Sequence, residues 1–267
     1  MSQIFWSEPG LPFVEVRRAQ KSRACYRPHT HPTWSIGVVD AGYSTFSYER
    51  SEPIRLAAGD VVVIQPHQVH SCNPDTDSAW SYQMLYLDDH WVQSVLVELE
   101  MGVLGLKRHH PTRIRDLGCY RAVTAFTAML FQPYAVNYKE SVLIELIGQI
   151  FASSTYTPEI KPPGWLRTIQ LLLSEQYARD WPVAVLADIV GLSRYHFIRA
   201  FHAYTGMTPH AYLLDCRINQ ARNLLRTGCA LADVAQILGF ADQSHFHHAF
   251  KQRVAVTPRQ YLMRQGS

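Results

Sequence analysis

The sequence predicts a two-domain protein in which a β-rich N-terminal domain precedes an all-helical C-terminal domain. Three observations support this prediction: the length of the chain, a change of pattern near residue 90, and a repeat in the last third. The chain has 267 residues, enough for about two domains, and 47% of them are hydrophobic, enough for folded cores. We assign residues 1–90 to the first domain and residues 165–267 to the second.

The part of the chain up to residue 87 shows the pattern of short strands. Two glycine-containing pairs interrupt it, and the first, Ala41-Gly42, stands where a hairpin turn is expected. Regular short strands separated by Gly and Pro turns favour a β-sandwich or a barrel. The expected strands, rich in β-branched and aromatic residues, lie at 13–16, 34–40, 43–49, 54–56, 61–65 and 82–87.

Helical periodicity follows at 91–100, 114–131 and 141–152. The last segment has an apolar stripe, which is typical of a core but, between two domains, also suits a dimer interface. We therefore expect residues 91–153 to form a helical connection that mediates a homodimer. Residues 154–164, rich in Ser, Thr and Pro, are expected to form a linker. The stripe consists of Leu143, Leu146, Ile147 and Ile150.

Charge and cysteine content limit the class of protein. Residues 165–267 hold 11 Lys and Arg against 6 Asp and Glu, so a polyanion partner is expected for this part alone. The five cysteines are scattered and form no CxxC pair, which favours reduced thiols in the cytoplasm. The sequence shows no run of about 18 apolar residues and no signal peptide, so we expect no membrane span.

The last third of the chain contains an internal repeat. The segment 186–192 matches 234–240, and the residues from His196 to Leu213 match those from His245 to Leu262 at a nearly constant offset. Each copy has a short helical segment, a glycine turn, and a second helix with an apolar root and a polar outer face. This is the outline of a helix-turn-helix, expected at about 183–205 and at about 231–254.

A long helix is expected between the two units. Thr208 is a suitable N-cap and Pro209 a suitable first residue, and the helix to about Leu225 spans 17 residues, or roughly 25 Å. Thr227-Gly228 would end it at a glycine. Two second helices held by such a rod could enter successive major grooves, which lie about 34 Å apart on one face of DNA.

The outer faces of the two second helices carry residues that can contact DNA. Arg199 could pair with a guanine edge and Gln243 could read an adenine. Lys251, Arg253 and Arg259 are better suited to phosphates, which position a protein without reading sequence. We expect more base readout from the first helix than from the second. The expected DNA-binding residues are Arg194, Tyr195, Ile198, Arg199, Gln243, Ser244, His247, His248 and Lys251.

The segment from Leu186 to Leu262 resembles the DNA-binding domain of the AraC/XylS family of bacterial transcription regulators. The resemblance implies an all-helical domain that binds DNA through both helix-turn-helix units. The matching features include Leu186-Ala187, Gly191-Leu-Ser193, Gly206-Met-Thr-Pro209, Asp233-Val-Ala235, Gly239-Phe240 and Val256-Thr-Pro258.

The N-terminal domain resembles the cupin-type sensor found in that family, which implies a β-barrel or jelly roll. His29-Thr-His31 and Gly59-Asp60 followed by His70 match the cupin signatures. In cupin enzymes an HxH pair, a glutamate and a last histidine bind a metal, but residues 32–39 contain no glutamate. Three interpretations stay open: a metal site, histidines satisfied within a barrel core, or a small-molecule pocket. We favour the pocket, framed by His29, His31, Trp34 and His70, and expect no metal, cofactor or catalytic residue.

The sequence therefore predicts a ligand-responsive transcription factor and not an enzyme. We expect it to bind double-stranded promoter DNA as a homodimer, to respond to a small-molecule effector, and to contact RNA polymerase if it is an activator. Two alternatives stay open. One is a metal-dependent cupin enzyme fused to a DNA-binding module, and the other is an N-terminal domain that dimerises the chain without any ligand.

Overall fold

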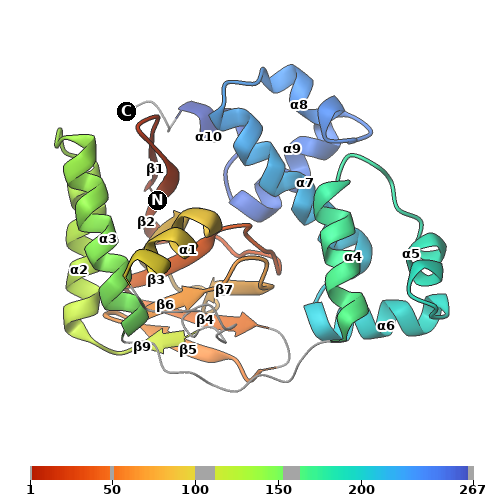
Figure 1. The fold of residues 1–267 in the computed structure, drawn as a ribbon, viewed down its shortest axis with the longest axis horizontal. Coiled ribbons are helices and arrows are strands. Elements are labelled where there is room, and N and C mark those ends of the chain that lie inside the picture. The colour runs from red at the N-terminus through yellow and green to blue at the C-terminus, as the bar shows by residue number, and fades with distance from the viewer. Residues whose placement is uncertain (1, 49–50, 100–111, 153–162, 264–267) are drawn as a thin grey trace.

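A computed structural model describes residues 2–48, 51–99, 112–152 and 163–263 (Figure 1). Sheets dominate the N-terminal part and helices form the C-terminal part, which confirms the predicted order of β then α. The strands are β1 (Ser2–Glu8), β2 (Leu11–Ser22), β3 (Trp34–Ala41), β4 (Tyr43–Tyr48), β5 (Ile54–Ala57), β6 (Val61–Ile64), β7 (His70–Pro74), β8 (Trp80–Leu87) and β9 (Thr112–Ile114). The helices are α1 (Asp89–Glu98), α2 (Leu117–Leu130), α3 (Val136–Ala152), α4 (Gly164–Glu175), α5 (Val183–Ile189), α6 (Arg194–Thr205), α7 (Pro209–Arg226), α8 (Leu231–Ile237), α9 (Gln243–Val254) and α10 (Pro258–Met263).

The strands form two antiparallel sheets, with the orders β1-β2-β8-β3-β6-β9 and β5-β4-β7. Since β3 and β4 belong to different sheets, the prediction of a hairpin at Ala41-Gly42 is wrong. Gly42 has a φ of +78°, and a Cβ there would lie 2.5 Å from the carbonyl oxygen of Ala79. Glycine is required at this point because the chain turns tightly against its own backbone as it passes from one sheet to the other.

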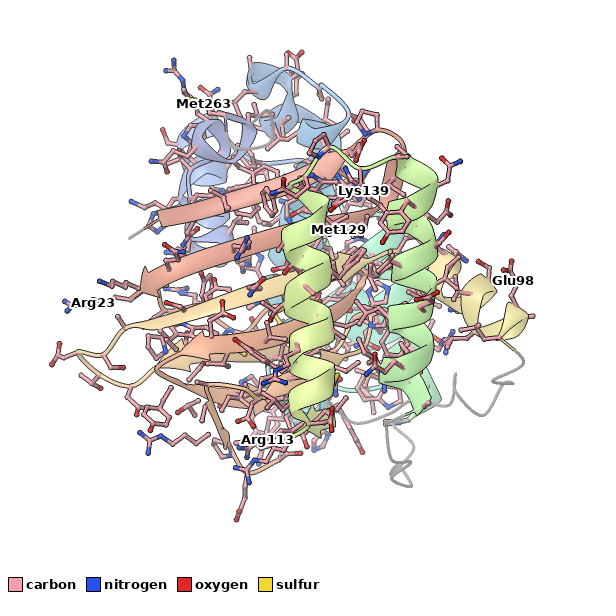
Figure 2. All side chains as sticks on the ribbon, turned by 90° about the vertical axis from the view of Figure 1, so that its left-hand side faces the viewer. Arg23, Glu98, Arg113, Met129, Lys139 and Met263 are labelled. Atoms are coloured by element: carbon pink, nitrogen blue, oxygen red, sulfur yellow. The ribbon has the colours of Figure 1, made fainter. Side chains whose placement is uncertain are left out.

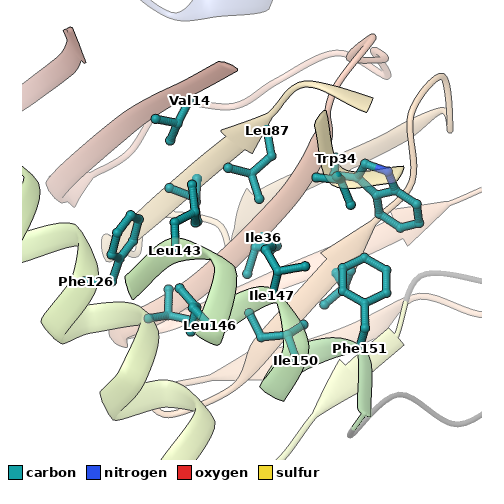
Figure 3. Close-up of a cluster of buried hydrophobic side chains, with 14 of the residues drawn as sticks. Val14, Trp34, Ile36, Leu87, Phe126, Leu143, Leu146, Ile147, Ile150 and Phe151 are labelled. Atoms are coloured by element: carbon teal, nitrogen blue, oxygen red, sulfur yellow. The ribbon is translucent and has the colours of Figure 1, made fainter. Parts of the chain in front are cut away.

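Alternate residues of the large sheet face two different cores, as the pleat of a strand requires. Trp34 and Ile36 on β3 and Leu87 on β8 face the helices α1, α2 and α3. Met84 and Tyr86 on β8 face the interior between the two sheets. Figure 2 shows α2 and α3 lying across the outer face of the large sheet, and Figure 3 shows the apolar side chains packed between them.

The apolar stripe of α3 lies in this core. Leu143, Leu146, Ile147 and Ile150 are all buried against the sheet of the same chain. A homodimer would therefore have to use other surfaces of these helices. In the described part of 91–153 the helices pack on the sheet as one unit with it, and most of the predicted linker at 154–164 lies outside the described residues.

The helices α4 to α10 form two small cores, to which the long helix α7 contributes on both sides. Phe197 and Phe201 of α6 are fully buried in one core, and Phe246 and Phe250 of α9 are fully buried in the other. The repeat in the sequence thus corresponds to a repeat in the packing. Within the described ranges, no helix has the length and apolar character needed to span a membrane.

Candidate DNA-binding surface and histidine pocket

The first helix-turn-helix unit consists of α5 and α6, joined at Gly191, whose φ is +66°. The hydroxyl of Ser193 caps α6 by accepting a hydrogen bond from the backbone N–H of His196 at 3.3 Å. Arg199 donates a hydrogen bond to the hydroxyl of Tyr195 at 2.8 Å, so these two side chains form one polar surface. The predicted contact residues of this unit are all exposed: Arg194, Tyr195, Ile198 and Arg199.

The second unit consists of α8 and α9, joined at Gly239, whose φ is +72°. A Cβ at this position would lie 2.1 Å from the carbonyl oxygen of Ala178, so only glycine fits. The carboxylate of Asp242 caps α9 by accepting a hydrogen bond from the N–H of His245 at 2.7 Å. Four predicted contact residues are exposed on α9: Gln243, Ser244, His248 and Lys251.

Two residues of α9 lie differently from the expectation. His247 is half-buried, with its ring edge against Phe246. Arg253 is buried, and its Nε lies 3.5 Å from a carboxylate oxygen of Asp215 on α7. The prediction that Arg253 binds phosphate is therefore wrong, because its guanidinium is enclosed in the protein.

The helix α7 joins the two units and spans 18 residues. Thr208 caps it by accepting a hydrogen bond from the N–H of Ala211 at 3.2 Å. At its other end Gly228 has a φ of +85°, and the N–H of Cys229 donates to the carbonyl of Leu224 at 2.9 Å. This Schellman closure satisfies carbonyls at the end of the rod, as the sequence predicts.

Arg217, buried on α7, ties the two units to each other. Its guanidinium donates hydrogen bonds to the backbone carbonyls of Tyr177 and Gly239, both at 2.8 Å, and pairs with Asp180 at 2.9 Å. Gly239 forms the turn of the second unit, and Tyr177 lies on the segment between α4 and α5 in front of the first. One side chain of the rod thus binds both the segment that leads into the first unit and the turn of the second.

The three predicted pocket histidines come together in the N-terminal domain. The ligand nitrogens of His29, His31 and His70 all lie within 4.8 Å of one another, and all three side chains are buried. His29 Nδ1 lies 2.8 Å from the carbonyl oxygen of Arg27, and His70 Nδ1 lies 2.9 Å from that of Gln68. Since a carbonyl oxygen only accepts, Nδ1 of these two rings carries the proton and Nε2 carries a lone pair.

Burial keeps these imidazoles neutral. Desolvation lowers the pKa of His70 to about 4 and lowers the pKa of His29 and His31 well below the ordinary value. The neighbouring imidazoles and the guanidiniums of Arg17 and Arg222 lower the pKa of His31 further, because positive charge disfavours imidazolium. Neutral rings are the form that accepts hydrogen bonds or binds metals.

Trp34 lies apart from this cluster. Its ring packs edge-on against Phe151 of α3, and its Nε1 donates a hydrogen bond to Asp89 at 2.8 Å. These contacts place it on the helix-covered face of the large sheet (Figure 3). Of the four residues expected to frame a ligand pocket, the structure brings together only the three histidines.

The C-terminal domain docks beside the histidines through one polar face of α7. Asp215, Asn219 and Arg222 are spaced so that they share this face. Arg222 Nη1 lies 3.2 Å from His31 Nδ1, and Asn219 donates to the backbone carbonyl of Thr30 at 2.9 Å. The carboxylate of Asp215 accepts from the N–H of Thr30 at 2.7 Å and from its hydroxyl at 2.6 Å.

A buried carboxylate of the N-terminal domain, Glu15 on β2, closes this interface. It accepts hydrogen bonds from Arg222 at 2.6 Å, from Arg226 at 3.3 Å and from the hydroxyl of Tyr261 at 2.8 Å. Burial alone would raise the pKa of Glu15, but the two guanidiniums and these hydrogen bonds hold it below its ordinary value. Glu15 is therefore the ionised centre of a docking contact that the sequence analysis did not identify.

A cavity of about 20 Å³ lies between the two domains. Arg17 lines it, with its guanidinium held by Gln3 at 3.1 Å and by the hydroxyl of Tyr26. This volume suits a water molecule or a single ion, whereas an organic ligand needs a pocket of roughly 300 Å³ or more. An organic effector could enter here only if the domains moved apart. Other lining residues are His29, His31, Tyr86, Ile218 and Arg222.

Comparison with known proteins connects both domains to transcription regulators. A family model described as an AraC-like ligand binding domain matches residues 12–113, and one described as a helix-turn-helix domain matches residues 186–264. The chain is 26% identical over 237 residues to an uncharacterized HTH-type transcriptional regulator, YbfI, of Bacillus subtilis, covering 87% of this chain and 85% of YbfI. It is 24% identical over 261 residues to the HTH-type transcriptional activator RhaS of Enterobacter sp., covering 95% of this chain and 91% of RhaS.

Solved structures show that the whole fold is shared. ToxT from Vibrio cholerae aligns with a TM-score of 0.61 and 14% identity, covering 99% of this chain and 100% of the ToxT chain. A ToxT structure with a bound unsaturated fatty acid aligns with a TM-score of 0.62 and 17% identity, covering 95% of each chain. The chain, with its AraC-like ligand-binding domain ahead of a helix-turn-helix domain, belongs to the AraC family of DNA-binding transcriptional regulators, which are not enzymes.

Proposed function

We propose that α6 and α9 enter successive major grooves of promoter DNA. The exposed polar faces of both helices and the stiff rod α7, with Arg217 fixing the two units on it, support this arrangement. Arg199 on α6 reads a base edge, whereas Lys251 on α9 binds phosphate. The first helix therefore contributes more to sequence discrimination than the second.

A small-molecule effector bound at the histidines of the N-terminal domain controls this DNA binding. The observation that carries this proposal is the direct contact between α7 and the residues of the cluster, Arg222 with His31 and Asp215 with Thr30. A ligand at the histidines would change the contacts that hold both helix-turn-helix units. An effector can shift the equilibrium only by binding two arrangements with different affinity. ToxT is known with an unsaturated fatty acid and with a naphthalenyl butenoic acid, so a small carboxylic acid suits this fold.

The active form is a homodimer and, if it activates transcription, it contacts RNA polymerase. Because the apolar stripe of α3 is occupied within the chain, the dimer uses exposed residues of the same helical layer, such as Leu117, Tyr134 and Tyr138. Sedimentation of the wild type and of Tyr138→Glu tests this surface. A monomeric wild type would rule out the dimer.

A specificity measurement tests the role of Arg199. After selection of a binding site from random DNA, Arg199→Ala should weaken binding by about 1–3 kcal/mol and relax the preference at one base pair. Arg55→Ala, which removes an exposed arginine of the N-terminal domain, is the matched control and should leave both unchanged. Unchanged specificity of Arg199→Ala would exclude base readout by this residue.

A spacing measurement tests the use of two grooves. Inserting five base pairs between the two halves of the selected site rotates one half by about half a helical turn relative to the other. Binding through both helices at once should then be lost, whereas an insertion of about ten base pairs restores the same face of the DNA. Equal affinity for all three spacings would contradict the two-groove arrangement.

A further inference from the structure

Three largely buried arginines, contributed by both domains, line the cavity between the domains. Arg17 lies on β2 of the N-terminal domain, whereas Arg222 on α7 and Arg253 on α9 belong to the C-terminal domain. The exposed fraction is 5% for Arg17 and 8% for Arg253, and the side chain of Arg222 is 11% exposed. Taking a guanidinium out of water costs free energy unless a negative charge or hydrogen-bond acceptors replace its hydration. Each of the three charges therefore needs compensation within the protein.

Two carboxylates at the junction compensate for two of these charges. Glu15 pairs with Arg222 at 2.6 Å, and an oxygen of Asp215 lies 3.5 Å from Arg253 Nε. Arg17 forms no ion pair with a carboxylate within the described ranges. Three guanidiniums against two carboxylates leave one positive charge in excess at the cavity.

Neutral groups compensate for part of the charge of Arg17. Its Nη2 donates hydrogen bonds to the side-chain oxygen of Gln3 at 3.1 Å and to the hydroxyl of Tyr26. Aromatic rings attract a cation placed over them, and three rings surround this guanidinium. Its central carbon lies 5.4, 5.2 and 5.7 Å from the ring centroids of Phe5, Tyr26 and Tyr82. None of these groups carries a negative charge.

The three arginines also share an unused hydrogen-bond donor. The Nε of Arg17, of Arg222 and of Arg253 is enclosed and has no hydrogen-bond acceptor among the described residues. An anion in the cavity would accept from such donors and would cancel the excess charge. The volume of about 20 Å³ suits a single ion. We propose that this cavity binds a compact monovalent anion of the size of chloride, held by Arg17 from one domain and by Arg222 and Arg253 from the other.

The remaining polar groups of the cavity are compatible with an anion. Asp215 is the only carboxylate among the described lining residues, and one of its oxygens is occupied by Thr30. That oxygen accepts from the N–H of Thr30 at 2.7 Å, from its hydroxyl at 2.6 Å and from Asn219 at 3.3 Å. These donors reduce the repulsion that its charge would exert on the ion. The imidazoles of His29 and His31, which also line the cavity, can donate to an anion or leave it undisturbed.

The site is complete only when the two domains are docked, because its arginines come from both. An ion that binds the docked arrangement and not the released one stabilises docking by mass action. The anion concentration is thus an input separate from an organic effector at the histidines. The consequence for DNA binding rests on the proposed function, whereas the anion site and its effect on docking are independent of it.

Thermal unfolding of the full chain, without DNA, tests the anion site. Sodium chloride is exchanged for sodium gluconate at constant ionic strength, so that general screening is unchanged and the larger anion does not fit the cavity. Chloride should raise the melting temperature by about 2–5 °C when it exceeds its Kd about tenfold. Stabilisation by acetate and not by chloride would assign the site to the carboxylate of a ligand and overturn the free ion. Stabilisation by neither would overturn the site.

Two variants on the same strand separate this site from a general effect of chloride. Arg17→Met should unfold at the same temperature in chloride and in gluconate. Arg18→Met is the matched control, because Arg18 is half-buried on β2 but lies over the ring of Phe131, away from the cavity, and should keep the full chloride effect. Equal chloride effects in the two variants would contradict the assignment to Arg17.

A crystal of the wild type grown in sodium bromide locates the ion without any variant, and so decides the question if Arg17→Met does not fold. Bromide should give an anomalous peak in the cavity, in contact with Arg17. Peaks on the surface alone would mean an adventitious ion only and would overturn the site. In solution, chloride should slow amide hydrogen exchange in α7 relative to gluconate, and unchanged exchange would overturn the effect on docking.

Discussion

Replacing Glu15 by glutamine should loosen the docking of the DNA-binding domain on the sensor. Glu15 is only 2% exposed and accepts hydrogen bonds from Arg222 at 2.6 Å, Arg226 at 3.3 Å and Tyr261 at 2.8 Å. Removing one partner of a buried ion pair costs about 3–5 kcal/mol, because the opposite charge stays buried without compensation. Glutamine keeps one acceptor oxygen, so we expect the lower end, about 3 kcal/mol, or more than a hundredfold in the docking equilibrium.

The pH dependence of this contact has a definite sign. The pKa of Glu15 lies below the value of 4.5 expected in the unfolded chain, because Arg222 and Arg226 outweigh the cost of burial. The contribution of its carboxylate to stability is therefore present above about pH 4.5 and is lost as the pH falls through the folded-state pKa. Glu15→Gln should lack this loss on acidification.

Urea denaturation of the full chain at pH 7 and pH 4, followed by tryptophan fluorescence and circular dichroism, measures both effects. Asp75→Asn is the control, because it breaks an exposed pair with Arg55 and should change the free energy of unfolding by less than about 1 kcal/mol. If Glu15→Gln lost no more stability than this control, or kept the acid sensitivity of the wild type, the assignment of Glu15 as the centre of the interface would be refuted.

Four further substitutions test the backbone and the second interdomain carboxylate. Gly239→Ala should prevent stable folding of the second unit, since its Cβ would lie 2.1 Å from a backbone oxygen. The Cβ of Gly191→Ala meets nothing within 4 Å, so this variant should lose only about 1–2 kcal/mol of stability because of its positive φ. Equal melting temperatures of the two variants would contradict this difference. Ala255→Gly should stabilise the chain by about 0.5–1 kcal/mol in denaturant, because Ala255 ends α9 at a φ of +60°. Burial raises the pKa of Asp215 to about 6. The stability that its protonated carboxyl contributes to the folded state is therefore fully present below the unfolded pKa of 3.8 and is lost as the pH rises through 6. Asp215→Asn should abolish this part of the pH dependence, which urea titrations between pH 4 and 7 would show.

The fold was predictable where one local rule decides the structure. The C-terminal domain follows from helix caps, glycine turns and a repeat, each of which acts within a few residues, so α6, α7 and α9 lie where the sequence indicates. In the N-terminal domain β1, β7 and β9 were not predicted. Their stability comes from pairing with β2, β4 and β6, and such long-range partners leave little trace in a local pattern.

The site was predictable only in part, for a related reason. The histidines could be found because their spacing is a motif, but the direction of Trp34 depends on which face of β3 meets the helices, a choice made by tertiary packing. The docking face of α7 was missed because polar residues on a helix usually face water. Only the spacing of Asp215, Asn219 and Arg222 on one face hinted at a partner.

The N-terminal domain contacts the first helix-turn-helix unit, the second unit and the rod between them, and these contacts limit how an effector could act. Val69 packs into the core of the first helix-turn-helix unit, Phe5 packs into that of the second, and Glu15 binds the rod between them. Contacts with both units fix the orientation of the whole DNA-binding domain on the sensor, while the exposed faces of α6 and α9 stay turned to solvent. Under the proposed function, a ligand at the histidines would therefore have no need to cover the DNA-binding surface. It would act by changing the free energy of this docked orientation, and the contacts that the released form lacks would limit how far it shifts the equilibrium.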